Sequence, residues 1–321
     1  MSFGALLAAF TPASFPWLIY ITYGILSGLG GGVGYICTIS AAQKWFPNHR
    51  GIATGICVGV FGLSVTIFAP ILSFFLREFS VQTTFFILSA AFLTVSMVVG
   101  RQIEYPTEQE APPSKMDGKR QFTIREMMQQ RAFYHLVLSF FLVTVAFFVV
   151  TPAVQTLSLY RGFSLEFATM LLMITGIANT AGRFLVPVLS DKMRNEIIVL
   201  SLMVILMTAS LTLTFASGPL FVIMVTLIPI CFGAALSVFP IITADYFGLK
   251  NIGSNYGVVG AMGFATSALI MPGLIGMLGS YTVRFVAVSA LSAVGIYTMG
   301  WLAWDVRLKE KESLLKEDFT K

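Results

Sequence analysis

Long runs of apolar residues dominate the chain, and short polar segments separate them. Each run continues for about 20 residues, the length that an α-helix needs to cross a bilayer, whereas strands of a membrane barrel alternate over about 10. The expected fold class is therefore all-α, a polytopic membrane helix bundle. The nine predicted spans cover residues 17–43, 51–76, 82–102, 132–158, 165–189, 196–216, 219–244, 253–278 and 281–305.

The composition of the chain supports lipid as its main solvent. Hydrophobic residues make up 56% of the 321 positions and charged residues only 11%, against about 25% charged residues in soluble domains. The net charge is +5, but the basic residues lie in loops and in the tail instead of forming one dense face. We therefore expect the lipid bilayer, and no nucleic acid, as a partner.

The basic residues also predict the orientation of the spans. Three basic residues, Arg77, Arg161 and Arg284, lie in one set of alternate loops. Most of the others lie in the second set, at 44–50, 101–131, 190–195 and 245–252, and in the tail from 306. Basic loops stay in the cytoplasm. We therefore expect a multi-pass protein of the plasma (inner) membrane with a cytoplasmic C-terminus.

One long polar stretch, residues 104–131, contains prolines and mixed charges and is typical of a linker between two units. We predict that it is a cytoplasmic linker. It follows an incomplete N-terminal helical half, 1–103, and precedes a six-helix C-terminal half, 132–305. Residues 306–321 form the expected cytoplasmic tail.

An internal repeat explains why the two halves differ in length. The segment FPNHRGIATGICVG, which begins at Phe46, resembles FGLKNIGSNYGVVGA, which begins at Phe247. Gly51 and Gly55 match Gly253 and Gly257 at an offset of 202 residues. If both halves are homologous six-helix units, the first one lacks about two and a half helices. We therefore expect a chain truncated at its N-terminus, in which residues 1–10 end a third helix.

Four motifs carry a resemblance to a known family. They are YGILSGLGGGVGY from Tyr23, KWFPNHRGIATG from Lys44, NTAGRFLVPVLSDK from Asn179 and YFGLKNIGSNYG from Tyr246. With the plan of six plus six helices, they resemble the major facilitator superfamily and, within it, the oxalate/formate antiporter and bacterial monocarboxylate transporter group. The resemblance implies a major facilitator fold and secondary transport of small organic anions by alternating access.

The glycine-rich motif allows two interpretations. Gly24, Gly28 and Gly32 recur every four residues and would form a flat stripe on which a neighbouring helix packs closely. Alternatively, the glycines make the helix pliable for alternating access.

Arg183 is the basic residue that lies within a predicted span, about 12 Å from the end that Asp191 marks. A cation at such a depth costs at least about 2.5–3.5 kcal/mol and normally faces a cavity or a partner. Its guanidinium fork matches a carboxylate, and Asn179 lies one turn away on the same face. Alternatively, Arg183 extends toward Asp191 and locks the cytoplasmic gate. The resemblance favours anion binding, because it places the carboxylate-binding arginine in this Asn-x-x-x-Arg helix, and it places Tyr35 near the substrate.

The substrate class depends on a departure from the family pattern. The resemblance places a lysine within an Ala-Lys-Gly triplet of the eleventh helix, where this chain has Met262 between Ala261 and Gly263. A dianion facing Arg183 alone would keep an uncompensated charge in a poorly solvated site. We therefore predict a monocarboxylate such as lactate, pyruvate or formate, with Met262 at the substrate. An oxalate or dicarboxylate antiporter is the alternative.

Candidate gating residues follow the same helix. The motif Gly-x-x-x-Asp-Lys/Arg-x-Gly-Arg is replaced here by PVLSDKMR, which contains Asp191 and Lys192. Asp191 could pair with a basic residue or with a helix N-terminus and hold the inward gate shut. Lys44 and Arg50 are the candidate basic partners from the first half.

The remaining predictions concern coupling and chemistry. A proton relay usually requires an Asp or Glu deep in the membrane, and the predicted spans hold none. Antiport or uniport is therefore favoured. A counter-transported anion or proton is the expected second solute. The sequence shows no cluster of catalytic or metal-ligating residues, which argues against a membrane enzyme, a cofactor or a metal. We expect a monomer. A non-transporting truncated fragment remains the other alternative.

Overall fold

The computed structural model describes residues 1–319 apart from 13, 108–109, 111, 114–117 and 119. The described residues form helices and connecting segments, which confirms the all-α prediction. The first part of the chain contains α1 (Ser2–Ala9), η1 (Tyr20–Ser27), α2 (Gly28–Trp45), α3 (Arg50–Glu78), α4 (Val81–Val99), η2 (Gly100–Gln102) and α5 (Ile124–Met128). The second part contains α6 (Arg131–Val150), η3 (Thr151–Ala153), α7 (Val154–Tyr160), α8 (Leu165–Leu185), η4 (Pro187–Asp191), α9 (Asn195–Thr212), α10 (Gly218–Phe247), α11 (Ile252–Gly260), η5 (Ala261–Ala265), α12 (Thr266–Gly276) and α13 (Tyr281–Phe319).

The nine predicted spans are confirmed within the described part of the chain. Each of nine continuous helical segments is long and apolar enough to cross a membrane. Their bounds are Tyr20–Trp45, Arg50–Glu78, Val81–Gln102, Arg131–Tyr160, Leu165–Asp191, Asn195–Thr212, Gly218–Phe247, Ile252–Gly276 and Tyr281–Asp305. The chain is therefore a multi-pass membrane protein.

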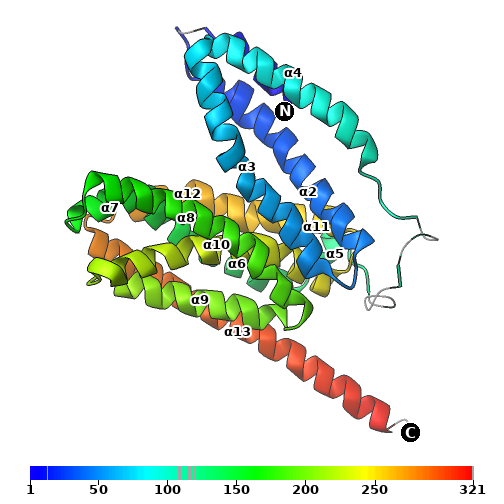
Figure 1. Ribbon diagram of the computed structural model, residues 1–321. Coiled ribbons are helices and arrows are strands. Elements are labelled where there is room, and N and C mark those ends of the chain that lie inside the picture. Colours follow the sequence, from blue (N-terminus) through cyan, green and yellow to red (C-terminus); the bar gives the residue numbers. More distant parts are fainter. Residues whose placement is uncertain (13, 108–109, 111, 114–117, 119, 320–321) are drawn as a thin grey trace.

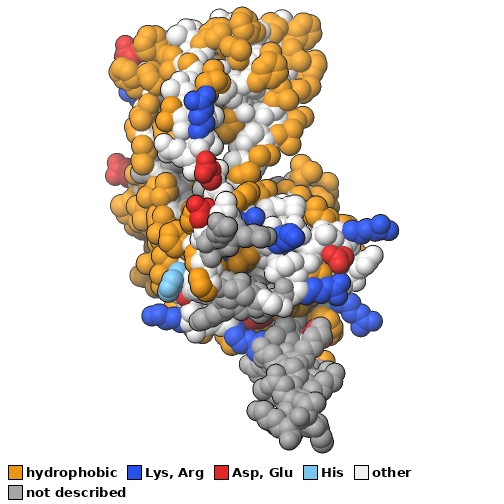
Figure 2. All heavy atoms as spheres, turned by 90° about the vertical axis from the view of Figure 1, so that its right-hand side faces the viewer, with side chains coloured by type: hydrophobic (Ala, Val, Ile, Leu, Met, Phe, Trp, Pro, Cys, Tyr) orange, Lys and Arg blue, Asp and Glu red, His pale blue; other side chains and the backbone are white. Residues whose placement is uncertain are grey.

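The helices form two groups that meet at one end (Figure 1). The N-terminal group contains α1 to α4 with η1, and the C-terminal group contains α6 to α13. The groups touch where α2 ends and α3 begins, which is also where the linker runs, and they diverge toward the opposite side. We call the first side the linker end and the second the open end. In Figure 2, Lys and Arg side chains gather around the linker, and hydrophobic side chains cover the upper part.

The glycines of the sequence repeat lie where the two groups meet. A Cβ atom at Gly51 would be 2.1 Å from the carbonyl oxygen of Pro187, so α3 crosses the end of the α8–η4 span in very close contact. A Cβ atom at Gly253 would be 3.4 Å from Oγ of Ser40, where α11 crosses α2. The repeat therefore supplies one close helix crossing from each group.

The C-terminal group is built around α10, which packs tightly against α8. A Cβ atom at Gly182 of α8 would be 2.1 Å from the carbonyl oxygen of Ile230, and one at Gly233 of α10 would be 2.0 Å from that of Asn179. Two small residues thus let the backbones of α8 and α10 approach each other closely, as in other membrane helix pairs. This packing fixes the helix that carries Asn179 and Arg183.

The predicted linker contains local structure that its polarity did not indicate. Thr123 and Glu126 form a reciprocal capping box at the start of α5, and the Thr123 hydrogen bonds hold the pKa of the Glu126 carboxyl below its usual value. The backbone N–H of Phe122 donates to the carbonyl oxygen of Phe247 over 3.0 Å. Asn255 donates in turn to the carbonyl oxygen of Phe122. The linker is thus attached to the connection between α10 and α11.

Candidate functional site

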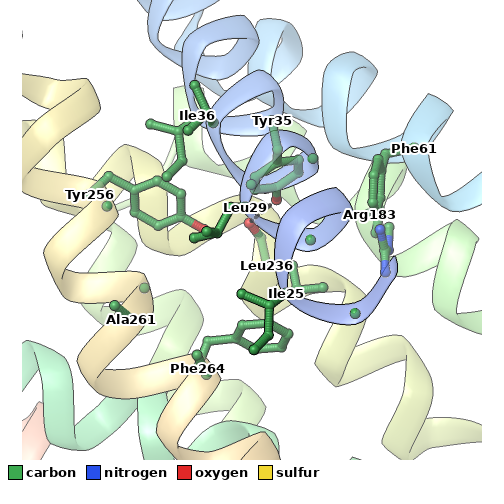
Figure 3. A pocket seen from close by; sticks show the side chains of 18 of the residues that line it. Ile25, Leu29, Tyr35, Ile36, Phe61, Arg183, Leu236, Tyr256, Ala261 and Phe264 are labelled. Atoms are coloured by element: carbon green, nitrogen blue, oxygen red, sulfur yellow. Dashed lines mark hydrogen bonds between the residues drawn. The ribbon is translucent and has the colours of Figure 1, made fainter. Parts of the chain in front are cut away.

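A cavity of about 720 Å³ lies between the two groups of helices. Its wall comes from η1, α2 and α3 of the N-terminal group and from α8, α10, α11 and η5 of the C-terminal group. Figure 3 shows that side chains from both groups converge on it. The lining residues include Gly24, Gly28, Gly32, Tyr35, Phe61, Arg183, Phe232, Leu236, Tyr256, Ala261 and Phe264.

Arg183 is buried in the wall of this cavity, with 9% of its surface exposed. Its Nε atom donates to Oδ1 of Asn179 over 3.0 Å, and its Nη1 atom donates to the carbonyl oxygen of Val58 over 3.4 Å. Both acceptors are neutral, and within the described part of the chain no carboxylate lies at ion-pair distance from the guanidinium. The site therefore holds a buried cation that protein charges do not compensate, which favours an anionic ligand.

Glycines on α3 allow the cation to reach the neighbouring helix. A Cβ atom at Gly62 would lie 3.0 Å from Cδ of Arg183, and a Cβ atom at Gly59 would lie 2.5 Å from the ring of Phe184. Side chains at these two positions would separate α3 from α8. Because both positions are glycine, Arg183 can contact the backbone of α3 and lie beside Phe61.

Two tyrosine hydroxyls complete the polar part of the site. Tyr35 lines the cavity, and its hydroxyl donates to the carbonyl oxygen of Leu236 over 3.5 Å. Tyr256 lines the same cavity, and Figure 3 shows its side chain pointing into the cavity. Sequence reasoning missed Tyr256, although a hydroxyl-bearing side chain inside a predicted span was the available signal.

The structure does not bring Met262 into the cavity wall. The side chain of Met262 is 41% exposed, whereas its neighbours Ala261, Phe264 and Ala265 line the cavity. The resemblance matched position 262 to a family triplet and gave no information on which of these neighbouring side chains lines the cavity. Residues Ala261–Ala265 form the π-helical segment η5.

The structure bears on the interpretation that the glycine-rich motif packs against a neighbouring helix. Gly24, Gly28 and Gly32 line the cavity instead of packing against a described helix. A Cβ atom at Gly28 or Gly32 would meet no described atom within 4 Å. Within the described residues no neighbouring helix therefore packs closely on Gly28 or Gly32, and the first glycine of the stripe, Gly24, lies in the π-helical segment η1.

Asp191 connects the two groups at the linker end. Its Oδ1 atom accepts from the backbone N–H of Gly51 over 2.8 Å, and its Oδ2 atom accepts from that of Ile52 over 3.1 Å. A carboxylate in this position satisfies N–H groups in the first turn of α3 and complements the helix dipole. Asp191 thus pairs with a helix N-terminus, one of its predicted partners, whereas Arg183 has other partners and does not reach it.

Arg50 makes a second connection at the same end. It forms an ion pair with Asp245 of α10, over 2.5 Å between Nη2 and Oδ1. Asn195 donates to the other oxygen of Asp245. Sequence reasoning missed this pairing, because it joins residues 195 positions apart.

The other two candidate gating residues lie outside these connections. The Nζ atom of Lys44 lies over the ring of Tyr105, 3.9 Å from its centroid. Lys192 is exposed. In the described residues, no group of three or more His, Cys, Asp or Glu side chains could hold a metal ion.

Comparison with known proteins adds a family and several relatives. A family model described as Major Facilitator Superfamily matches residues 1–270. The chain is 26% identical over 255 residues to an uncharacterized MFS-type transporter, YhjX, of Escherichia coli (strain K12), a match that covers 78% of this chain and 63% of the relative. It is 24% identical to an oxalate:formate antiporter of Oxalobacter formigenes, over 74% of this chain and 58% of that protein. It is also 24% identical to human monocarboxylate transporter 12, over 84% of this chain and 59% of that protein.

A solved structure supports the same fold. A crystal structure of the Major Facilitator Superfamily transporter FucP in the outward conformation aligns with a TM-score of 0.69 and 17% sequence identity. The alignment covers 94% of this chain and 80% of that one. The matches to the three relatives span about three fifths of each relative's length.

Proposed function

Because the chain belongs to the major facilitator superfamily, we propose that it is a secondary transporter of small monocarboxylates, such as lactate, pyruvate or formate. The observation that carries this proposal is the buried guanidinium of Arg183 in the wall of a cavity between two groups of helices. Its contacts within the described residues are to neutral oxygens, so an anion would supply the missing charge.

The neighbouring side chains have separate roles in this account. The guanidinium fork of Arg183 binds the substrate carboxylate, since this pairing combines charge with bidentate geometry. Asn179 positions the guanidinium through its hydrogen bond to Nε. The Tyr35 hydroxyl, whose bond to the Leu236 carbonyl is long at 3.5 Å, donates to the second carboxylate oxygen. The hydroxyl of Tyr256, which lines the same cavity, is a further hydrogen-bond donor for the substrate.

The charge of the site favours a monoanion. Among the described lining residues, Arg183 is the one cationic side chain. A monocarboxylate would neutralise it, whereas oxalate would keep one negative charge in a largely apolar cavity, which is costly. The similarity to an oxalate:formate antiporter is the reason to test a dicarboxylate as the alternative substrate.

The contacts at the linker end support alternating access. Because basic loops favour the cytoplasmic side, we propose that this end and the C-terminus face the cytoplasm, and that the membrane is the plasma (inner) membrane. Asp191 and the Arg50–Asp245 pair then close the cytoplasmic side while the groups diverge outside. Inward opening would break these contacts. Because the spans hold no deep acid that could relay protons, anion exchange or uniport is the favoured coupling.

Solute flux tests this function. The purified chain is reconstituted in proteoliposomes that contain unlabelled lactate, and the uptake of labelled lactate is measured with pyruvate, formate or oxalate outside. We expect uptake above that of protein-free liposomes, and stronger competition by pyruvate than by oxalate. Stronger competition by oxalate would select the dicarboxylate alternative. No flux with any of these acids would contradict the proposal.

A further inference from the structure

The cavity is polar at one end and apolar at the other. Its polar groups are Arg183 near the end of α8, Tyr256 near the start of α11 and Tyr35 within α2, and most of the other lining side chains are hydrophobic. Figure 3 shows Ile25 and Phe264 grouped on a different side of the cavity from Tyr35 and Tyr256. The lining thus separates into two regions of different chemistry.

The order of residues along the helices gives this separation a direction. Phe264 follows Tyr256 by eight residues, and the helix formed by α11 and η5 runs away from the linker end. Leu29 precedes Tyr35 by six residues, or about 9 Å, on a helix that runs toward the linker end. The apolar region therefore lies between the polar groups and the open end.

An aromatic cluster supports the apolar region from behind. Phe264 packs beside Phe148 and Phe232, with ring centroids 5.8 and 6.1 Å apart. Phe232 is stacked on Phe147 at 3.7 Å. Phe264 is half-buried, so part of its ring faces the cavity while the rest is held by the cluster. A wall held in this way is a preformed surface for an apolar group.

The geometry points to a preference among monocarboxylates for an amphipathic acid whose aromatic or branched apolar body lies against Phe264 and Phe232, with the one- to three-carbon acids bound more weakly at the same carboxylate site. This inference rests on the proposed function, since Arg183 still holds the carboxylate. A cavity of about 720 Å³ falls within the range of pockets that enclose drug-sized ligands. An acid of one to three carbons would leave the apolar wall in contact with water. Each buried methylene group instead tightens binding about fourfold.

Acetate and phenylacetate form the matched pair of probes, because both carry the same carboxylate and only one carries a ring. Equilibrium binding to the purified chain is measured by isothermal titration calorimetry for both acids, with phenylacetamide as the uncharged control. We expect phenylacetate to bind at least tenfold more tightly than acetate, because a buried ring leaves water. Phenylacetamide should bind much more weakly than phenylacetate.

Three variants assign the effect to the cavity wall. Phe264→Ala should weaken phenylacetate binding about tenfold, and weaken acetate binding much less. Ala261→Leu, at an exposed lining position, narrows the cavity without removing a packed ring and should also weaken phenylacetate more than acetate. This second variant keeps the test valid if Phe264→Ala does not fold. Phe215→Ala, at a residue that is 67% exposed outside the cavity, is the control and should change neither affinity.

Arg183→Gln separates this inference from the proposed function. If acetate and phenylacetate bind equally and both affinities depend on Arg183, the carboxylate site stands and the apolar-body inference is overturned. If phenylacetate binding is unaffected by Arg183→Gln, the inference and the proposed function both fail. Tight phenylacetate binding that depends on both Arg183 and Phe264 supports the inference.

Discussion

The guanidinium of Arg183 donates a hydrogen bond to the carbonyl oxygen of Val58, a residue 125 positions earlier in the chain. This bond joins α8 of the C-terminal group to α3 of the N-terminal group beside the cavity. A carboxylate is a stronger acceptor for a guanidinium than a backbone carbonyl. A substrate bound here would therefore contact the residue that links the two groups, so its binding can influence how they are held together.

The cap that Asp191 forms on α3 should control access at the linker end. Asp191→Ala removes the acceptors of two first-turn N–H groups, a loss that costs about 0.5–2 kcal/mol at a helix N-terminus. We expect faster maleimide labelling of a Ser40→Cys probe, with the three native cysteines replaced by serine, because Ser40 is buried where α2 meets α11. Lys192→Ala, at the exposed neighbouring residue, is the control. Equal labelling rates in both variants would show that Asp191 does not hold this end closed.

The ion pair between Arg50 and Asp245 should be energetically coupled. Its side chains are 14% and 26% exposed, whereas those of the Arg120–Glu126 pair are 67% and 40% exposed. A double-mutant cycle with Arg50→Gln and Asp245→Asn should give a coupling free energy above about 1 kcal/mol, within the range for residues in contact. The same cycle at Arg120 and Glu126 should give less, because exposed pairs contribute about 0–1 kcal/mol. Thermal unfolding of each variant gives the two coupling free energies. Equal values for the two pairs would contradict the structural role of Arg50.

The close crossing of α3 over η4 predicts a difference between two glycines. Gly51→Ala places a methyl group against the backbone oxygen of Pro187, and such overpacking typically costs about 1–3 kcal/mol. Gly176→Ala, on α8, meets no described atom within 4 Å and should be neutral or slightly stabilising. Melting temperatures in detergent compare them. A Gly51→Ala protein as stable as the Gly176→Ala protein would show that the crossing is looser than described.

The position of a second cation should decide whether dicarboxylates bind. Ala261→Lys introduces an ammonium group into the cavity wall, whereas Met262→Lys introduces it at a residue outside that wall. A hydrogen bond to a charged group contributes about 1.5–3 kcal/mol. We therefore expect Ala261→Lys to raise the ratio of oxalate to lactate affinity tenfold or more, and Met262→Lys to change it little. The opposite result would show that position 262, and not position 261, faces the bound substrate.

Much of the fold could be predicted from the sequence, because membrane spans depend on local composition. The nine apolar runs predicted helices whose observed ends differ by a few residues. Arg183 and Asn179 could be placed on one helix face from their spacing alone. Tyr35 was placed near the substrate by the family resemblance, and Asp191 at a gate by its position at a helix end.

The contacts between the two groups of helices could not be predicted from the sequence, because they depend on how the helices cross. The pairing of Arg50 with Asp245 and the close approach of Gly62 to Arg183 join residues that are distant in the chain. Met262 lies outside the cavity wall whereas its neighbour Ala261 lines it, although the hydrophobic pattern continues through both positions. Residue periodicity predicts the faces of regular helices and carries no signal for these features.

The most direct test of the central claim is lactate uptake by proteoliposomes that contain the wild-type chain, Arg183→Lys or Arg183→Gln. The account predicts that Arg183→Gln loses at least tenfold in uptake, as expected when a hydrogen bond to a charged group worth about 1.5–3 kcal/mol is lost. Arg183→Lys should be intermediate, because it keeps the charge and loses the planar fork. The melting temperatures should stay close to that of the wild type, since Arg183 forms no ion pair with a described residue. Undiminished uptake by folded Arg183→Gln protein would contradict the account.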